Sequence, residues 1–548
     1  MEFYVYRNSA DSSLHMSLSY SVDQTFWSRR GDRTELIAVT RSMGKAYEII
    51  QQGTNLLPGA RAPEREWDHQ EWKALVKQAK EVEVILQGRS LLWPEVEALL
   101  HKRKLKTGRA ELAHTIQLLY LQGKVRYKPG VELSGPAARW ICHRCLAGGS
   151  LLKLSACARC GERCAGCEQC LLLGKSRSCI PFLLFGNGDK KKVCGDHAFT
   201  IPFSLTSAQQ GAVQKIERFL TSTEHQLLVW AVTGAGKTEI MVPGVGYVLE
   251  QGGKVLWTTP RKDVVHELAP RLKKLLPKTK VCALYGGSPD LWLDGAVVVA
   301  TAHQTWRFYQ YFDLAIIDEV DAFPLYGNKA LEQGIVRALR QSAKQILLTA
   351  TPPPEWKSMV RSGRLGAVTL PVRYHGYPLP VPELIREWGL WKKLRDCRPI
   401  SPLSAFLKRM KQTEGQALLF VPRVQDVKTV LLWLKEREPE TGCQAAGVFG
   451  QDRQREKTMQ LFRERKLQVV VTTTILERGV TVPRCHVLVI GADHPVFDRP
   501  SLIQIAGRVG RSGEYQQGEV RFLANEKTEA QNQAKKEIEW LNQLAKRL

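Results

Sequence analysis

A glycine-rich loop with one lysine and one threonine lies between an apolar run and a stretch of helical periodicity. Residues 231–238 of this loop read AVTGAGKT. Glycines let backbone N–H groups approach phosphate oxygens, and the N-terminus of the helix that follows adds positive potential. Lys237 would reach the β- and γ-phosphates of a nucleotide, and the Thr238 hydroxyl would bind Mg²⁺. We therefore expect ATP to be bound by Thr233, Gly234, Ala235, Gly236, Lys237 and Thr238.

An acidic pair follows another apolar run, in residues 314–321, which read LAIIDEVD. In open sheets of parallel strands, ligands bind beyond the carboxyl ends of the strands, where this pair is expected to lie. Asp318 is predicted to orient Mg²⁺ together with Thr238, and Glu319 to orient and activate the attacking water. Acidic pairs after strands are common, but the preceding run and the spacing from the loop both favour ATP hydrolysis.

Cysteines are concentrated in one part of the chain, where nine of the 13 lie between Cys142 and Cys194. The first four form two C-x2-C pairs, each of which puts two sulfurs about one turn apart. A reducing cytosol disfavours disulfides, and four thiolates suit tetrahedral Zn²⁺. The eight candidate zinc ligands are Cys142, Cys145, Cys157, Cys160, Cys164, Cys167, Cys170 and Cys179.

The sequence leaves the pairing of these cysteines open. The pairs 142/145 and 157/160 could form one site, with the next four cysteines closing a second and Cys194 left over. Alternatively the sites interleave, with 142/145 joined to 164/167. An iron–sulfur cluster also uses four cysteines, and free structural cysteines are a further alternative, but this density favours zinc. An all-thiolate zinc site has no open position, so we expect it to be structural.

The charge balance indicates a polyanionic partner. The 548 residues include 79 Lys+Arg and 54 Asp+Glu, which give a formal net charge of +25. Self-repulsion of that size is tolerable when the partner is a nucleic acid. The sequence has no apolar run of about 18 residues, the length needed to span a membrane, and it starts without a signal-peptide pattern. We expect a cytoplasmic protein, with peripheral contact at the inner face of the cell membrane left open.

Short apolar runs alternate with amphipathic helical stretches from residue 205 onward. Continuous apolar strands between helices indicate parallel sheets covered on both faces. The runs fall into two groups, which the proline-rich stretch 370–398 separates. Strands are predicted at 226–232, 254–258, 295–300, 314–317 and 346–349 in the first group, and at 417–421, 469–472 and 487–490 in the second.

The expected class is α/β, with two parallel-sheet lobes, an N-terminal α+β region and a cysteine-rich zinc module. The N-terminal region should span 1–135 and the module 136–196, followed by lobe 1 (197–372), a linker (373–398) and lobe 2 (399–548). Within the N-terminal region, residues 90–133 are a winged-helix candidate. Two helical stretches there precede residues 125–127 and 131–133, which read as a small hairpin. Such a unit can dock on DNA, although many serve only as protein–protein modules.

Several further motifs resemble those of superfamily 2 helicases, and they follow one another along the chain in the order found in that family. Residues 348–352 read LTATP, similar to the motif that couples the ATP site to strand movement in that superfamily. Residues 205–209 read LTSAQ, similar to its adenine-recognition segment, with Gln209 as the hydrogen-bonding residue. The resemblance covers about residues 200–548 and implies two RecA-like lobes. It also implies DNA contacts by Thr259, Pro260, Arg261, Thr301, His303, Gln304, Thr473 and Arg478.

The run QIAGRVGRSG at 504–513 resembles the arginine-finger motif of the same helicases. The resemblance implies that Arg508 and Arg511 lie across the cleft between the lobes from Lys237. A planar guanidinium fork suits the spread charge of a transferring phosphoryl group, and such a finger is worth roughly 10³–10⁵ in rate in related systems. Arg511 is expected to contact the γ-phosphate, with Arg508 sharing that contact or positioning the loop.

A cysteine module placed before the phosphate loop and followed by a compact pair of lobes is similar to the late competence family ComFA. That resemblance implies an ATPase that moves single-stranded DNA during natural transformation, with competence proteins and a membrane DNA channel as partners. The primosomal helicase family PriA is the alternative, but its cysteines lie between the lobes, where this chain has only Cys397. An RNA helicase and a nucleic-acid-binding scaffold with a degenerate ATP site are weaker alternatives.

Overall fold

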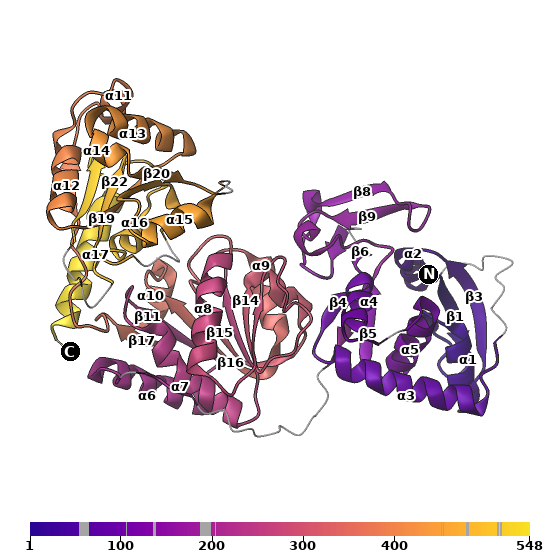
Figure 1. Cartoon of the computed structure of the whole chain (residues 1–548). Helices are drawn as coiled ribbons and strands as arrows, with labels where there is room; N and C mark the ends of the chain where they lie inside the picture. The colour runs from indigo at the N-terminus through magenta and orange to yellow at the C-terminus, as the bar shows by residue number, and fades with distance from the viewer. Residues whose placement is uncertain are drawn as a thin grey trace.

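The computed structural model shows three bodies in a row, with lobe 1 between lobe 2 and the N-terminal part (Figure 1). It describes residues 1–53, 65–105, 107–134, 139–186, 199–202, 204–450, 452, 454–477, 482–511, 515 and 518–547. None of the described helices is long and apolar enough to cross a membrane. The expected α/β class is confirmed, and each of the eight predicted lobe strands is present, in one of two parallel sheets.

Lobe 1 is built on a seven-stranded sheet in the order β13-β14-β12-β15-β16-β11-β17, and all of its strand pairs are parallel. In β12 every side chain is buried, and since successive side chains point to opposite faces, helices must cover both faces. The strands are β11 (Gln226–Ala231), β12 (Val255–Thr259), β13 (Val281–Leu284), β14 (Val297–Thr301), β15 (Phe312–Asp318), β16 (Leu339–Thr349) and β17 (Gly366–Leu370). The helices are α6 (Ser207–Thr221), α7 (Lys237–Glu250), α8 (Lys262–Leu275), η3 (Ala302–Arg307), α9 (Lys329–Ala338) and α10 (Pro354–Arg361).

Lobe 2 has a six-stranded parallel sheet in the order β18-β23-β22-β19-β21-β20. Its edge strand β18 comes from the segment expected to be a linker, so that segment contributes to the lobe. The strands are β18 (Glu383–Arg386), β19 (Gln416–Phe420), β20 (Ala445–Val448), β21 (Val469–Thr472), β22 (Cys485–Ile490) and β23 (Val520–Ala524). The helices are α11 (Leu390–Arg395), α12 (Ser401–Gln412), α13 (Val424–Arg437), α14 (Pro439–Gly442), α15 (Arg455–Arg463), η4 (Thr474–Leu476), α16 (Arg499–Ala506) and α17 (Glu529–Ala545).

The N-terminal part contains two small antiparallel sheets, in the orders β2-β1-β3 and β4-β10-β5. Its strands are β1 (Phe3–Asn8), β2 (Leu14–Ser17), β3 (Thr34–Thr40), β4 (Ser90–Leu92), β5 (Val125–Pro129) and β10 (Pro181–Phe185). Its helices are α1 (Tyr20–Ser28), α2 (Met43–Gln52), α3 (His69–Leu86), α4 (Trp93–Lys102) and α5 (Arg109–Leu121). The apolar faces of all five helices and of both sheets share one core.

The predicted hairpin of residues 125–133 is wrong. Strand β5 pairs with β10, more than 50 residues further along the chain, and β6 (Val131–Ser134) pairs instead with β7 (Arg139–Cys142). The chain between β5 and β10 forms a module that contains the eight candidate zinc ligands, β8 (Leu152–Ala156), β9 (Arg163–Cys167) and the short helices η1 (Gly149–Leu151) and η2 (Leu171–Leu173). Two strands that are adjacent in the sequence therefore belong to different sheets, because a folded insertion separates β5 from its partner.

The N-terminal part packs tightly on lobe 1 at the turn before β4. The Tyr309 N–H donates to the carbonyl of Gly88 at 2.9 Å, and the Ser90 hydroxyl donates to the carbonyls of Trp306 and Phe308 at 2.6 and 3.0 Å. Gly88 has φ +72°, and a Cβ atom there would lie 2.0 Å from the Tyr311 ring. Only glycine therefore lets the two bodies approach this closely.

Replacement of this glycine is expected to weaken the contact. Gly88→Ala should lower the free energy of unfolding by about 2–4 kcal/mol, because it adds a steric clash to a left-handed backbone. Gly123→Ala is the matched control, since Gly123 has φ +71° with nothing within 4 Å of the added Cβ atom. Urea unfolding of both variants checks the prediction, and equal losses would show that the approach to Tyr311 contributes nothing.

Candidate functional site

The glycine-rich loop lies at the carboxyl end of β11 and leads directly into α7. Gly234 and Gly236 have φ of +81° and +79°, in the left-handed region that favours glycine. Gly236 is the N-cap of α7, so that Lys237 and Thr238 form its first turn. The loop thus presents backbone N–H groups and a helix N-terminus to the same space, an arrangement that suits a phosphate group.

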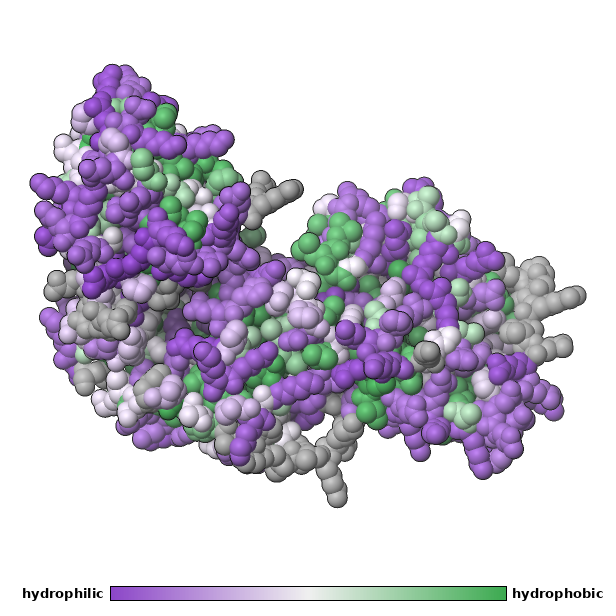
Figure 2. Space-filling model, in the orientation of Figure 1, coloured by the Kyte–Doolittle hydropathy of each residue, from purple (hydrophilic) through white to green (hydrophobic). Residues whose placement is uncertain are grey.

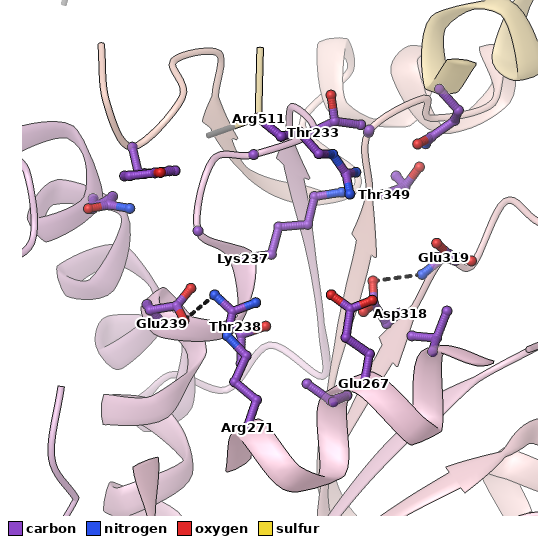
Figure 3. A pocket seen from close by; sticks show the side chains of 18 of the residues that line it. Thr233, Lys237, Thr238, Glu239, Glu267, Arg271, Asp318, Glu319, Thr349 and Arg511 are labelled. Carbon is purple, nitrogen blue, oxygen red and sulfur yellow. Dashed lines mark hydrogen bonds and ion pairs between the residues drawn. The ribbon is translucent and has the colours of Figure 1, made fainter. Parts of the chain in front are cut away.

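A cavity of about 700 Å³ opens beside this loop, and both lobes line it. Lobe 1 contributes the phosphate loop, the acidic pair and part of α8, while lobe 2 contributes two side chains, Gln504 and Arg511. Figure 3 shows the Lys237 side chain extended from the loop toward Arg511, with Glu267 and Asp318 on the other side of the space. Three basic side chains (Lys237, Arg271 and Arg511) and four carboxylates line this one space, which suits a phosphate chain with a bound divalent cation.

The acidic pair lies at the carboxyl end of β15, as expected, and the end of β16 is tied to it. The Glu319 N–H donates to Asp318 Oδ1 at 2.9 Å, and Glu319 has φ +51°, a strained conformation for this residue type. Asp321 accepts hydrogen bonds from the hydroxyls of Thr349 and Thr351, both at 2.6 Å. The last aspartate of the acidic motif thus holds the Thr-Ala-Thr segment, so that neither can move alone.

Gln209 also lines the cavity, from the start of α6. Its side-chain Oε1 accepts from the Thr206 N–H at 3.0 Å, and its Nε2 donates to the carbonyl of Ala235 at 2.9 Å. A Cβ atom on Gly236 would lie 2.5 Å from that Nε2. The amide therefore bridges the helix cap and the phosphate loop.

The two arginines of the predicted finger motif occupy different environments. Arg511 lines the cavity, whereas Arg508 is buried and its Nε donates to the carbonyl of Glu477 at 3.0 Å. Burial lowers the pKa of both guanidinium groups, and for Arg511 the carboxylates of Glu267 and Glu319 oppose this shift. The geometry therefore favours Arg511 for contact with a nucleotide and Arg508 for support of the loop.

Arg373 is a functional residue that the sequence analysis missed. It lies just after β17 and is 2% exposed, and its guanidinium donates to the carbonyls of Val509 at 2.8 Å, Gly510 at 2.7 Å and Gly507 at 3.3 Å. Its stem packs 3.6 Å from the position of a Cβ atom on Gly234. Burial lowers the pKa of Arg373 to about 9, with a smaller contribution from Arg511. One side chain thus joins the phosphate loop to residues 507–511, the finger loop that carries Arg511.

The residues predicted to hold DNA differ from one another in how far their side chains are buried. The side chains of Thr259, Pro260 and Gln304 are buried, whereas those of Arg261, Thr301, His303 and Thr473 are half-buried. Arg261 forms an ion pair at 2.8 Å with Glu477 of lobe 2, so it spans the lobes. Arg478 lies outside the described residues. The described positions lie at the carboxyl ends of β12, β14 and β21, on the side of both sheets where ligands bind.

The eight cysteines form two interleaved groups, and all eight side chains are buried. Site I consists of Cys142, Cys145, Cys167 and Cys170, and site II of Cys157, Cys160, Cys164 and Cys179. A site made from the two C-x2-C pairs is therefore wrong, and 142/145 joins 167/170 rather than 164/167. Cys164 and Cys167 are three residues apart on β9, so their side chains point to opposite faces and cannot share an ion.

Arg373 provides a test of how the finger loop is held. Arg373→Lys keeps a charge but loses the fork that bonds three carbonyls. ATP turnover at saturating ATP is expected to fall about 10- to 100-fold, the effect of a misplaced reacting group, while the half-saturating ATP concentration changes little. Arg386→Lys is the control, since that exposed arginine stacks on Trp388 away from the cavity. Turnover equal to that of the unmodified chain would rule out the clamp.

Comparison with known protein families agrees with this geometry. Residues 206–359 match the DEAD/DEAH box helicase family, and residues 399–513 match the helicase conserved C-terminal domain. Residues 77–184 match the competence protein ComFA N-terminal domain. The chain is thus a superfamily 2 helicase-like ATPase that binds nucleic acid. The DEAD-box helicase Mss116 bound to ssRNA is a solved neighbour, with a TM-score of 0.47 and 20% identity over 58% of this chain and 69% of that one.

Two curated relatives cover most of the same length. Competence protein ComFA of Bacillus subtilis is 37% identical over 381 residues, which span 69% of this chain and 81% of the relative. Competence protein ComFA of Streptococcus pneumoniae is 35% identical over 383 residues, which span 69% of this chain and 86% of the relative. With these identities and shares of length, and with the ComFA N-terminal domain matched over the cysteine module, the chain belongs to the ComFA family of competence proteins.

Proposed function

We propose that this chain is an ATP-driven motor that moves along single-stranded DNA and drives its uptake during natural transformation. The observation that carries the proposal is the cavity lined by both lobes, because hydrolysis there can be linked to movement of one lobe against the other. Opening and closing of that cavity would change the spacing between the parts of each lobe that grip the strand. Competence proteins and a membrane DNA channel are the proposed partners, at the inner face of the membrane.

The cavity residues can divide the work of hydrolysis. Lys237 and Arg511 bind the β- and γ-phosphates from opposite lobes, and Glu319 orients the attacking water. Thr238 and Asp318 offer a hydroxyl and a carboxylate oxygen, which are hard ligands that fit Mg²⁺. When bound, this ion neutralises charge on the phosphates. Arg373 and Arg508 keep the finger loop in place, so that Arg511 adds its charge only when the lobes are closed.

Strand binding would use the backbone of the DNA rather than its bases. The net charge of +25 favours phosphate contacts, which are independent of sequence and weaken as salt rises. The candidate contacts in lobe 1 are Arg261, Thr301 and His303, and Thr473 lies in lobe 2. Because Arg261 pairs with Glu477 across the lobes, its availability to the strand depends on closure. Alternating grip by the lobes then moves the strand.

Zinc fits both cysteine groups. Four thiolates at a Zn–S distance of 2.3 Å form a tetrahedron with edges of about 3.8 Å. The Sγ atoms of Cys142 and Cys170 lie 3.8 Å apart, those of Cys145 and Cys167 3.5 Å, and those of Cys157 and Cys179 3.8 Å. Bound zinc would link distant parts of a module that has little core of its own, which is a structural role.

The motor is tested by ATP hydrolysis with no DNA, single-stranded DNA, blunt duplex and forked duplex. Single-stranded DNA, with or without a fork, is expected to stimulate turnover about tenfold or more. Lys237→Ala should abolish turnover in every arm, and Arg511→Ala should lower it about 10³-fold or more while ATP binding is kept. Preference for the fork would favour replication restart instead, and turnover retained by Lys237→Ala would refute the assigned site.

Zinc is tested by metal analysis of the purified chain. We expect two zinc ions per chain, and one after Cys142→Ser/Cys145→Ser, because site II shares no ligand with site I. Cys443→Ser is the matched control, since that cysteine is exposed and belongs to neither group. A metal content unchanged by the double substitution, or iron in place of zinc, would contradict the assignment.

A further inference from the structure

Site I lies against lobe 1 through the loop between its first two cysteines. Arg337, on α9 of lobe 1, donates to the carbonyls of His143 at 2.9 Å and Arg144 at 2.8 Å. The same guanidinium donates to the carbonyl of Trp306 at 3.2 Å. Burial lowers the pKa of Arg337 to about 10, which still leaves it charged at neutral pH. One lobe 1 side chain thus holds both the metal-binding loop and the end of η3.

Glu95 is the centre of a buried network that joins three parts of the molecule. Its Oε1 accepts from Arg144 of the site I loop at 2.6 Å and from Arg307 of η3 at 3.0 Å, while Glu95 itself belongs to α4. Arg144 is fully buried and also donates to the carbonyl of Gly174 at 3.1 Å. Because two buried guanidinium groups depend on one buried carboxylate, removal of the Glu95 charge leaves both of them without that carboxylate.

The network ends at the segment predicted to hold the DNA backbone. Arg307 donates to the side chain of Gln304, and both lie in η3, directly after Thr301. The carbonyl of Trp306, in the same short helix, also accepts from the Ser90 hydroxyl at 2.6 Å. Helix η3 is thus bonded to Ser90 of β4 and to Glu95 of α4. Helix α4 is bonded in turn to the site I loop, through Arg144.

Another route for DNA contact by the N-terminal part is closed. A winged helix reads DNA through the second of its paired helices, which would be α5, but α1 and α3 cover that helix. Gln117, in the middle of α5, is buried and bonded to the Leu18 N–H at 2.9 Å and to Asp23 at 2.8 Å. Helix α5 therefore cannot enter a DNA groove while α1 and α3 cover it.

We propose that zinc-loaded site I positions the DNA-holding segment of lobe 1, through Arg144, Glu95 and Arg307. The proposal rests on the single-strand motor proposed above and gives the metal a part in strand binding. Arg144 and Arg307 share the one carboxylate of Glu95, which leaves an excess of positive charge, and Zn²⁺ with four thiolates would carry two net negative charges that offset this excess. Site I thus holds η3 in position, and Glu95 and Arg144 are positioning residues that need not touch the DNA. Hydrophobic surface gathers on the side of this module toward lobe 2 (Figure 2), and the exposed leucines of the module include Leu146 and Leu172.

The experiment compares Glu95→Gln with Glu97→Gln in the full-length chain. Both glutamates lie on α4, but Glu97 is half-buried and pairs with the exposed Arg109 at 2.9 Å, away from site I. Fluorescein-labelled oligothymidylate reports binding by anisotropy, and ATP hydrolysis is measured against its concentration. Glu95→Gln should raise both the Kd and the half-stimulating concentration about tenfold or more. Turnover without DNA, maximal turnover at saturating DNA and zinc content should not change, and Glu97→Gln should match the unmodified chain in every measurement.

A second comparison keeps the inference separate from general instability. Cys142→Ser/Cys145→Ser should weaken oligothymidylate binding by the same factor as Glu95→Gln, and combination of the two changes should add little, because both act through one network. Binding by Glu95→Gln equal to that of the unmodified chain, or additive losses in the combined variant, would overturn the inference alone. An unmodified chain that oligothymidylate neither binds nor stimulates would instead overturn the motor, and the inference with it.

Discussion

The structure depends on the close approach of two loops that belong to different lobes. The Thr233 hydroxyl donates to the carbonyl of Gly507 at 3.3 Å, and a Cβ atom at Gly507 would lie 2.1 Å from that hydroxyl oxygen. Arg373 lies beside this contact and bonds the same carbonyl. A nucleotide between the lobes has to be reached from both sides by side chains of limited length, so the backbones of the two loops must nearly touch. The glycine at position 507 follows from this constraint.

Much of the two lobes could be predicted from the sequence, because their signals are local. A continuous apolar run bounded by a glycine-rich loop or by acidic residues predicts a buried parallel strand with its functional end, as in β11 and β15. Strand β18 has no continuous apolar run that could predict it. It is a short edge strand in a proline-rich segment, and only half of its side chains are partly buried. Arg373 was equally hidden. An isolated arginine after a strand has no local pattern, and its role comes from three carbonyls that lie more than 130 residues away in the sequence.

The N-terminal part shows why spacing alone could not pair the cysteines or the strands. The cysteine pairing depends on knowing that residues 163–167 form a strand. Alternation along β9 sends Cys164 to site II and Cys167 to site I, whereas a loop at that place would allow them to share an ion. The wrong hairpin has a different origin, because β5 pairs with β10 across the inserted module rather than with the next strand in the sequence. Pro129 and Gly130 resemble a turn between neighbouring strands, but they mark the point where the chain leaves one sheet and enters the inserted module.

Three arginines of this chain share one physical pattern. Arg373 in the ATP site, Arg508 in the finger loop and Arg337 beside site I all donate to backbone carbonyls, and burial lowers the pKa of each. A carbonyl is a weak partner for a full charge, so each contact is stable only while the surrounding chain keeps several acceptors in place. Such contacts transmit displacement, because a shift of one loop would take the carbonyl acceptors away from a guanidinium group on the other. The proposed motor would have to convert small movements at the nucleotide into movement of a strand, and it would gain from contacts that are stable in one arrangement of the loops and unstable in any other.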